Sequence, residues 1–355
     1  MIISRTPYRI SFFGGGTDYP AWYRQHGGAV LATSIDKYCY LTARFLPPFF
    51  EHKFRVVYSK IEDCHSIDEI QHPAVREILR FLGIDRGVEI HHDGDLPARS
   101  GMGSSSSFCV GLLHALYALQ GRMPSKQQLA HEAIVLEQDV LHETVGSQDQ
   151  ITSAYGGFNE VLFKPSGEIS VRPVTLAPAR LRELESHLLL FFTGVKRTSS
   201  DVARSYADDL ESRKPHLQIM KDLVDEAIGT LNGGGDLGSF GALLHESWSA
   251  KRSLSAQVST SEVDEIYATA QANGAIGGKL LGAGGGGFLL LFARPDDHAL
   301  LREKLDRLIH IPFHFEAAGS QIIFYDPETE YPAEERARAN GGRRVFRDRG
   351  GLGSQ

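Results

Sequence analysis

The sequence predicts an α+β fold with two domains. Segments typical of strands and of helices follow one another in mixed order, without the strict alternation that indicates a parallel sheet. The 355 residues are enough for two domains, and 42% hydrophobic with 23% charged residues is typical of a globular chain with a sizeable core. The Pro-containing stretch "RPVTLAPARL" at 172–181 places the expected boundary near residue 180.

The first domain, expected at 1–180, combines strands with helices. β-Branched and alternating residues predict strands at 8–13, 37–45, 53–58 and 88–92. Apolar periodicity predicts helices at 73–83, 104–119 and 125–141. Ser125 is expected to cap the third helix, and the segment 156–174 is expected to form a hairpin that turns at 165–167.

The second domain is expected at 181–330 and begins with an apolar strand at 187–194. The patterns that follow predict helices at 200–211, 215–231, 239–253 and 261–273, and strands at 286–293 and 320–326. The remaining residues, 331–355, contain many glycines and arginines and are expected to form a flexible tail.

Charge and cysteine content argue against several classes of protein. The formal net charge is −7, so the chain lacks the basic surface on which nucleic-acid binding relies. Cys39, Cys64 and Cys109 are scattered and odd in number, which supports neither a disulfide framework nor a metal site. No apolar run approaches the ~18 residues of a membrane span. We expect a cytoplasmic protein that binds neither nucleic acid nor membrane, with a homodimer as one open alternative for its assembly.

The stretch "LPARSGMGSSSS" at 96–107 has the character of a phosphate-binding loop. Glycines let the backbone approach a ligand closely, and the first amides of a helix lack partners within the helix and carry partial positive charge. Hydroxyls at 104–107 add donors for phosphate, and one such oxygen suits magnesium. The alternative interpretation is a Gly/Ser linker or an ordinary capped turn.

Two better-known phosphate motifs do not account for the chain. It contains no G-x-x-x-x-G-K-[ST] sequence, so it is not a Walker-type NTPase by motif. The run "GAGGGG" at 282–287 fits G-x-G-x-x-G formally, but it leads into the apolar strand "FLLLFA" instead of a helix. We expect these glycines to pack closely against a ligand or against another backbone segment, with a simple tight turn as the alternative.

Three glycine-rich segments occur in a diagnostic order along the chain. They are "PYRISFFGGGTDYPAW" at 7–22, "LPARSGMGSSSS" at 96–107 and "KLLGAGGGGFLLLF" at 279–292. Together they resemble, in the same order, the three motifs of the GHMP kinases, a superfamily that includes galactokinase, homoserine kinase and mevalonate kinase. The resemblance extends to about Asp326. It implies a ribosomal protein S5-like N-terminal domain that binds ATP and a ferredoxin-like C-terminal domain.

Within this superfamily, four segments look most like bacterial D-glycero-D-manno-heptose 7-phosphate kinases. The segments are "GGGTDYPAW", "TGVKRTSS", "HESWSAKRSLS" and "GGKLLGAGGGGF". The resemblance implies transfer of the γ-phosphoryl group of ATP to the anomeric 1-hydroxyl of that sugar phosphate. A kinase for an unphosphorylated sugar of the fucose or galactose type, and a sensor without catalytic activity, are the alternatives.

The resemblance also implies the catalytic residues. "GSQDQITSAYGG" is similar to the galactokinase segment that carries the catalytic aspartate, and Asp149 occupies that position. As general base it would accept the proton of the attacking hydroxyl. Arg9 in "PYRIS" matches the basic residue that lies beside this aspartate and the transferring phosphate, where it would offset developing charge. A helix-capping aspartate and an exposed strand arginine are the alternatives.

The nucleotide and a magnesium ion are expected at the central loop and at one glutamate. The family match places ATP phosphates against Arg99, Gly101, Met102, Gly103, Ser104, Ser105 and Ser106. Arg99 departs from the smaller residue that the family often has there. Glu137 lies twelve residues before Asp149, as the metal glutamate of galactokinase does, and Ser105 matches the serine that completes that site. A solvated glutamate and a capping serine are the alternatives.

The sugar site is expected to combine residues from separate parts of the chain. The resemblance to galactokinase implies sugar contacts from Gly15, Gly16, Thr17, Asp18 and Gly157. A phosphate on the acceptor would need cations, for which we select Lys196, Arg197 and Arg252, with Lys251 as the neighbour of the last. A turn built on 14–18 and ordinary solvated charges are the alternatives.

Overall fold

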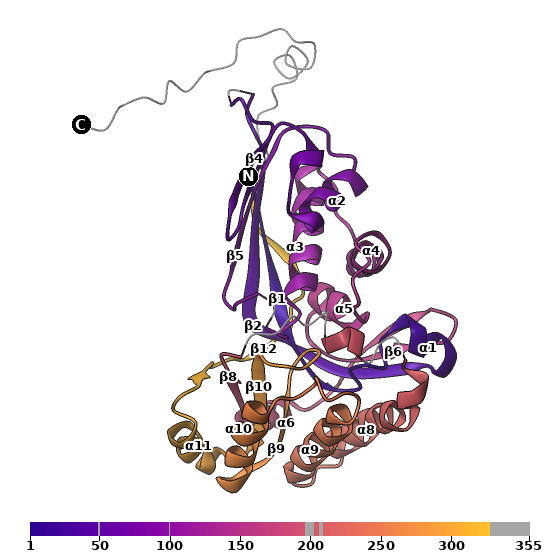
Figure 1. The fold of residues 1–355 in the computed structure, drawn as a ribbon, viewed down its shortest axis with the longest axis vertical. Coiled ribbons are helices and arrows are strands. Elements are labelled where there is room, and N and C mark those ends of the chain that lie inside the picture. Colours follow the sequence, from indigo (N-terminus) through magenta and orange to yellow (C-terminus); the bar gives the residue numbers. More distant parts are fainter. Residues whose placement is uncertain (49, 99, 196–201, 206–208, 327–355) are drawn as a thin grey trace, which may run out of the picture.

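The computed structural model of the protein describes residues 1–48, 50–98, 100–195, 202–205 and 209–326. These residues form two β-sheets, each with helices packed against it (Figure 1). The larger sheet and its helices fill the upper part of the view, and the smaller sheet with its helices fills the lower part. The fold class is α+β, as the sequence predicted.

The larger sheet is built around one long strand. β2 (Gly28–Phe45) pairs with β1 (Ile2–Phe13) along one edge, while on its other edge its first half pairs with β6 (Phe158–Phe163) and its second half with β5 (Val88–Gly94). The sheet is completed by β3 (Phe54–Val57), β4 (Ile61–Cys64) and β7 (Ile169–Pro173). β6 and β7 form the hairpin predicted at 156–174.

Helices cover one face of this sheet (Figure 1). The central one is α3 (Ser104–Leu119), which packs on β1 and β2 and begins at the serine that the sequence predicted. Around it lie α2 (Pro73–Phe81), α4 (Lys126–Val135) and α5 (Gln148–Tyr155). The short α1 (Pro20–His26) connects β1 to β2. The glycine loop before α3 is therefore held against the end of the sheet by a helix that is almost entirely buried.

The helix predicted at 125–141 is shorter and changes its winding. Ser125 caps α4 by accepting a hydrogen bond from the N–H of Gln128, as expected. After Val135 the chain widens into a π-helical turn at Leu136–Val140. Such turns leave backbone groups out of the regular ladder and occur frequently at functional sites. Here the turn carries Glu137.

The smaller sheet has the strand order β11–β8–β10–β9, and all its pairs are antiparallel. Its strands are β8 (Leu188–Phe192), β9 (Ala275–Leu280), β10 (Phe288–Ala293) and β11 (Ile309–His310). Its helices are α6 (Pro178–Ser186), α8 (Lys214–Asn232), α9 (Gly238–Arg252), α10 (Ser261–Ala272) and α11 (His298–Lys304). With α8 to α10 between β8 and β9, and α11 between β10 and β11, this is the predicted ferredoxin-like arrangement.

The last described strands return to the first sheet. β12 (Phe315–Glu316) pairs with β2, and β13 (Gln321–Tyr325) pairs with β1. A single cut near residue 180, with a second domain at 181–330, is therefore wrong for the end of the chain, because residues 315–325 belong to the N-terminal sheet. The predicted tail at 331–355 lies outside the described residues.

Candidate active site

The centre of the candidate site is an ion pair between β1 and α5. The guanidinium of Arg9 donates from Nε to Asp149 Oδ1 and from a terminal nitrogen to Asp149 Oδ2, both at 2.7 Å. Such two-pronged pairing fixes both groups in position. Arg9 is 3% exposed, whereas the Asp149 side chain is 23% exposed. The aspartate predicted as base is therefore held by the predicted arginine and keeps some accessible surface.

The central glycine loop is bonded to the same arginine. Arg9 donates a third side-chain hydrogen bond to the carbonyl of Gly101 at 2.7 Å, and its backbone N–H donates to the carbonyl of Met102 at 3.2 Å. Gly103, the N-cap of α3, has a φ of 76°. A Cβ at that glycine would lie 3.3 Å from Asp149 Oδ2. The N-terminus of α3 is thus placed beside the ion pair, where its partial positive charge favours an anion.

The residues of the predicted phosphate loop differ in how exposed they are. Met102 is 0% exposed, so its side chain belongs to the core and its carbonyl holds β1. Arg99 lies outside the described residues. Ser105 is exposed at the start of α3, and Ser106 is buried. The loop therefore presents Gly101, Gly103 and the first residues of α3 toward the pair.

The C-terminal glycine run packs directly against the central loop. A Cβ at Gly282 would lie 2.4 Å from the Cα of Gly101, and a Cβ at Gly287 would lie 2.1 Å from the carbonyl oxygen of Ser100. The φ angles of these two C-terminal glycines are 71° and 104°. Side chains are thus excluded by both sterics and backbone conformation. Close packing against another backbone segment, one of the options left by the sequence, is observed.

Glu137 is completely buried beside α3. Its Oε2 accepts a hydrogen bond from Ser106 Oγ at 2.7 Å and another from the side-chain amide of Gln150. Its Oε1 is buried without a hydrogen-bond partner among the described residues. Burial raises the pKa of Glu137 to about 7, although the hydroxyls of Ser106 and Ser105 and the Gln150 amide act in the opposite direction. Both serines thus face the glutamate, and one carboxylate oxygen is left for another ligand.

The segment predicted to bind sugar is tightly folded. The carboxylate of Asp18 accepts hydrogen bonds from the N–H of Gly16 at 2.8 Å and of Gln148 at 3.2 Å, and it is 1% exposed. Burial is the main cause of its raised pKa. This aspartate connects the first glycine segment to the start of α5, directly beside Asp149. Its role in this structure is to join the two segments.

Thr17 and Gly157, both predicted to contact the sugar, make hydrogen bonds within the protein. The hydroxyl of Thr17 contacts the carbonyl oxygens of Gly14 and Ala29, accepts from the Ala29 N–H, and is fully buried. The N–H of Gly157 donates to the carbonyl of Glu316, and its carbonyl accepts from the N–H of Ser34. Both residues have their polar groups engaged by the protein.

Two buried lysines from the second half of the chain lie near the ion pair. Lys251, at the end of α9, donates to the carbonyls of Leu280 and Gly282 and is 6% exposed. Burial and the charge of Arg9 lower the pKa of Lys251 to about 7, while Asp18 and Asp149 oppose that shift. Lys251 therefore brings its amino group close to the ion pair from the second domain.

Lys279 joins β9 to β1 by donating to the carbonyl of Phe12 at 2.7 Å. Burial and the charges of Lys251 and Arg9 place the pKa of Lys279 well below its ordinary value. Lys279 was not among the predicted site residues, although a lysine inside the otherwise apolar "AIGGKLL" was a detectable signal.

Of the predicted distal cations, only Arg252 lies within the described residues. Arg252 is exposed and pairs with Asp264 at 2.6 Å, whereas its neighbour Lys251 is the residue of this pair that lies near the ion pair. Adjacent helix positions point about 100° apart, and the sequence alone did not show which of the two faced inward. Lys196 and Arg197 lie outside the described residues.

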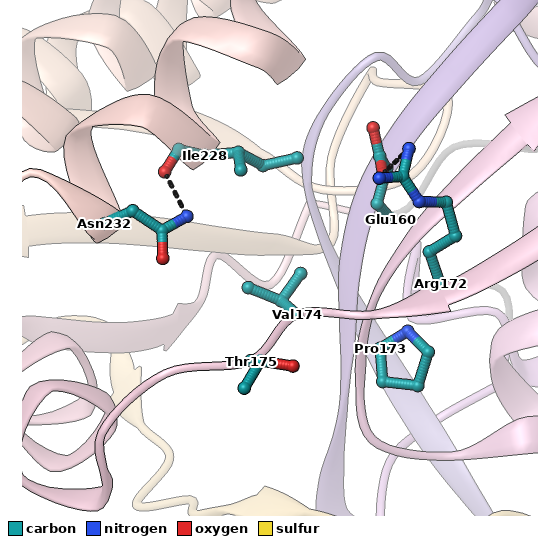
Figure 2. A pocket seen from close by; sticks show the side chains of 7 residues that line it. All are labelled: Glu160, Arg172, Pro173, Val174, Thr175, Ile228 and Asn232. Carbon is teal, nitrogen blue, oxygen red and sulfur yellow. Dashed lines mark hydrogen bonds and ion pairs between the residues drawn. The ribbon is translucent and has the colours of Figure 1, made fainter.

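A surface pocket between β7 and α8 is not part of this site. Figure 2 shows the pocket, of about 250 Å³, with the Glu160–Arg172 ion pair on one side and Ile228 and Asn232 of α8 on the other. None of the residues predicted to be functional lines it. We assign the chemistry to the ion pair and the loops around it.

The arrangement defines a class of protein. A carboxylate held by an arginine, next to a glycine loop and a helix N-terminus, is suited to moving a phosphoryl group onto a hydroxyl acceptor. In agreement with this, the family model for the GHMP kinases N-terminal domain matches residues 69–157, and the model for the GHMP kinases C-terminal domain matches residues 219–309. The chain belongs to the GHMP kinases, which are phosphotransferases with an alcohol group as acceptor.

Individual relatives agree with this assignment. The chain is 29% identical to the D-glycero-alpha-D-manno-heptose 7-phosphate kinase of Campylobacter jejuni over 83% of this chain and 90% of that protein. It is 26% identical to the mevalonate kinase of Pyrococcus abyssi over 82% of this chain and 89% of that protein.

Solved structures show the same fold. The D-glycero-D-manno-heptose 1-phosphate kinase of Bacteroides thetaiotaomicron is similar with a TM-score of 0.74 and 23% identity, covering 91% of this chain and 99% of that one. The galactokinase of Lactococcus lactis has a TM-score of 0.69 and 20% identity, covering 90% and 94% of the two chains. Among the described residues, no helix has the length and apolar character needed to cross a membrane.

The two neighbouring cations of α9 provide a test of the site. Replacing Lys251 with Met removes a buried charge near Asp149, and we expect kcat to fall about 10- to 100-fold. Arg252→Met removes only an exposed ion pair and should change kcat less than about twofold. Steady-state ADP formation measures both variants, and thermal unfolding controls for folding. Equal effects of the two substitutions would contradict the placement of Lys251.

Proposed function

We propose that the protein is an ATP-dependent sugar kinase that phosphorylates the anomeric 1-hydroxyl of D-glycero-D-manno-heptose 7-phosphate. The observation that supports phosphoryl transfer is the contact of the Arg9–Asp149 pair with the loop at Gly101. The choice of sugar rests on the relative from Campylobacter jejuni, which carries that name. The product would be the 1,7-bisphosphate, an intermediate for nucleotide-activated heptose in capsule or lipopolysaccharide synthesis. We expect the reaction in the cytoplasm.

Asp149 is suited to act as the general base. Its carboxylate keeps 23% of its surface accessible while Arg9 fixes both oxygens. An acceptor hydroxyl that hydrogen-bonds to this carboxylate would be oriented for attack and would transfer its proton there as the new O–P bond forms. Arg9 would offset the negative charge that develops on the transferring group. Lys251 adds positive charge from the other domain.

The start of α3 is suited to the phosphates of ATP. Gly101 and Gly103 leave the backbone bare of side chains, and their positive φ angles of 86° and 76° shape the turn into the helix. The amides and hydroxyls of Ser104, Ser105 and Ser106 follow in the first helical turn, where donors and the helix dipole favour anions. This supports the phosphate role predicted for the loop.

The residues around Glu137 fit a magnesium ion. The unpartnered Oε1 of Glu137 and the neighbouring hydroxyls of Ser105 and Ser106 are hard oxygen donors, which magnesium prefers. Waters and phosphate oxygens would complete the six ligands. Among the described residues there is no group of three or more His, Cys, Asp or Glu side chains around one point. A magnesium ion would neutralise charge on the phosphates of ATP.

Two alternatives use the same site differently. A kinase for an unphosphorylated sugar would need Arg9, Asp149 and the loop but no distal cations. Lys196 and Arg197, the cations proposed for the 7-phosphate, would therefore determine whether a phosphorylated or an unphosphorylated sugar is preferred. A sensor without activity is disfavoured because the proposed base Asp149 pairs with Arg9, and the proposed metal ligand Glu137 is held by Ser106 of α3.

Asp149→Asn tests the assignment of the base. The amide keeps the size of the side chain but accepts no proton, so we expect kcat to fall by about 10²- to 10⁴-fold. Binding of ATP should remain nearly unchanged, because the loop and the metal ligands are retained. Nucleotide affinity measured by calorimetry serves as the control. A variant with wild-type turnover would exclude Asp149 as the base.

A panel of acceptors tests the substrate. ADP formation should be fastest with D-glycero-D-manno-heptose 7-phosphate and at least about tenfold slower, in kcat/KM, with the unphosphorylated heptose, fucose and galactose. Position 1 of the product is assigned by ³¹P NMR. Higher kcat/KM for an unphosphorylated sugar would establish the first alternative, and no ADP with any acceptor would favour the sensor.

A further inference from the structure

Ser11 presents an unused hydroxyl on the same strand face as Arg9. The pairing of β1 with β2 is regular from Arg9 through Ser11, so side chains two residues apart point the same way. Ser11 is 6% exposed, and its Oγ is buried without a hydrogen-bond partner among the described residues. Leaving a buried hydroxyl unsatisfied destabilises the folded protein, so such groups call for an explanation. A bound ligand that supplies the missing hydrogen-bond partner is one such explanation.

Gln148 presents a second unused oxygen. It is the first residue of α5 and immediately precedes Asp149. Its backbone N–H is engaged by Asp18, but its side-chain Oε1 is buried and has no partner within the described part of the chain. The unsatisfied oxygens of Ser11 and Gln148 thus come from β1 and from α5, the two elements that supply Arg9 and Asp149.

Gly15 brings these two side chains to one place. A Cβ at Gly15 would lie 3.4 Å from Gln148 Nε2 and 3.5 Å from Ser11 Oγ, and no other described atom beyond its chain neighbours is within 4 Å. The φ angles of Gly14 and Gly16 are 80° and 106°, but Gly15 is not in the positive-φ region. The backbone therefore does not require glycine at position 15. A methyl group at position 15 would contact only this hydroxyl and this amide, at ordinary van der Waals distances.

We propose that Ser11 and Gln148 bind the acceptor hydroxyl on the carbon next to the one that is phosphorylated, in the space beside Gly15. This rests on the proposed function, because Asp149 must hold the reacting hydroxyl while its neighbour Gln148 holds the adjacent one. A vicinal diol, the pattern found in sugars, matches two adjacent polar groups of this kind. An acceptor without the second hydroxyl leaves Ser11 and Gln148 unsatisfied and is rejected.

The experiment compares one acceptor with its deoxy analogue. The acceptor is the best substrate of the panel, and the analogue lacks the hydroxyl at position 2, next to the reacting position 1. We expect Ser11→Ala to lower kcat/KM for the full acceptor about 10- to 100-fold and for the deoxy analogue less than about threefold. Gly15→Ala, which fills the space, should act in the same direction. KM for ATP should stay at the wild-type value in both variants.

Gly235→Ala is the matched control for the glycine substitution. A Cβ there meets nothing within 4 Å, and the residue is not in the positive-φ region, so activity should be unchanged. Thermal unfolding shows that the variants fold. If Ser11→Ala and Gly15→Ala lower kcat/KM equally for both acceptors, or for neither, the assignment is wrong while the proposed function stands. A wild-type protein that forms no ADP with any hydroxylated acceptor overturns both proposals.

Discussion

The structure around the site depends on one buried ion pair. Arg9 is almost fully buried, and its guanidinium donates hydrogen bonds to both oxygens of Asp149 and to the carbonyl of Gly101. Removing one partner of such a pair leaves an uncompensated charge at a cost of about 3–5 kcal/mol. Strand β1, helix α5 and the glycine loop must therefore keep their relative positions. Asp18 reinforces this by joining the first glycine segment to α5.

Close backbone packing is the second constraint, and it connects the two domains. Gly101 and Gly282 approach so closely that neither has room for a Cβ. Lys251 binds the carbonyl of Gly282, and Lys279 binds the carbonyl of Phe12 on β1. Glycines thus provide the contact between the loops, and hydrogen bonds from the two buried lysine side chains hold the segments around it. Both lysines also lie close to Arg9.

Most of the fold and the central pair could be predicted from the sequence. Periodicity located α3 and α10, and the glycine segments in order indicated the family. The pairing of β12 and β13 with the first sheet could not be predicted, because strands that pair from such distant parts of the sequence leave no local pattern. Two features of the site could not be predicted either, because they depend on which atoms face one another in the folded chain. One is that Lys251 faces the ion pair while Arg252 is exposed, and the other is the unpartnered oxygens of Ser11 and Gln148.

The most direct test of the central claim is the coupling between Arg9 and Asp149 in turnover. kcat is measured for Arg9→Met, for Asp149→Asn and for the double variant, with thermal unfolding as the check on folding. If the two side chains act as one unit, the double variant loses about as much as the more damaged single variant. Losses that multiply would show that the two residues act independently, and an Arg9→Met variant with wild-type turnover would contradict the account.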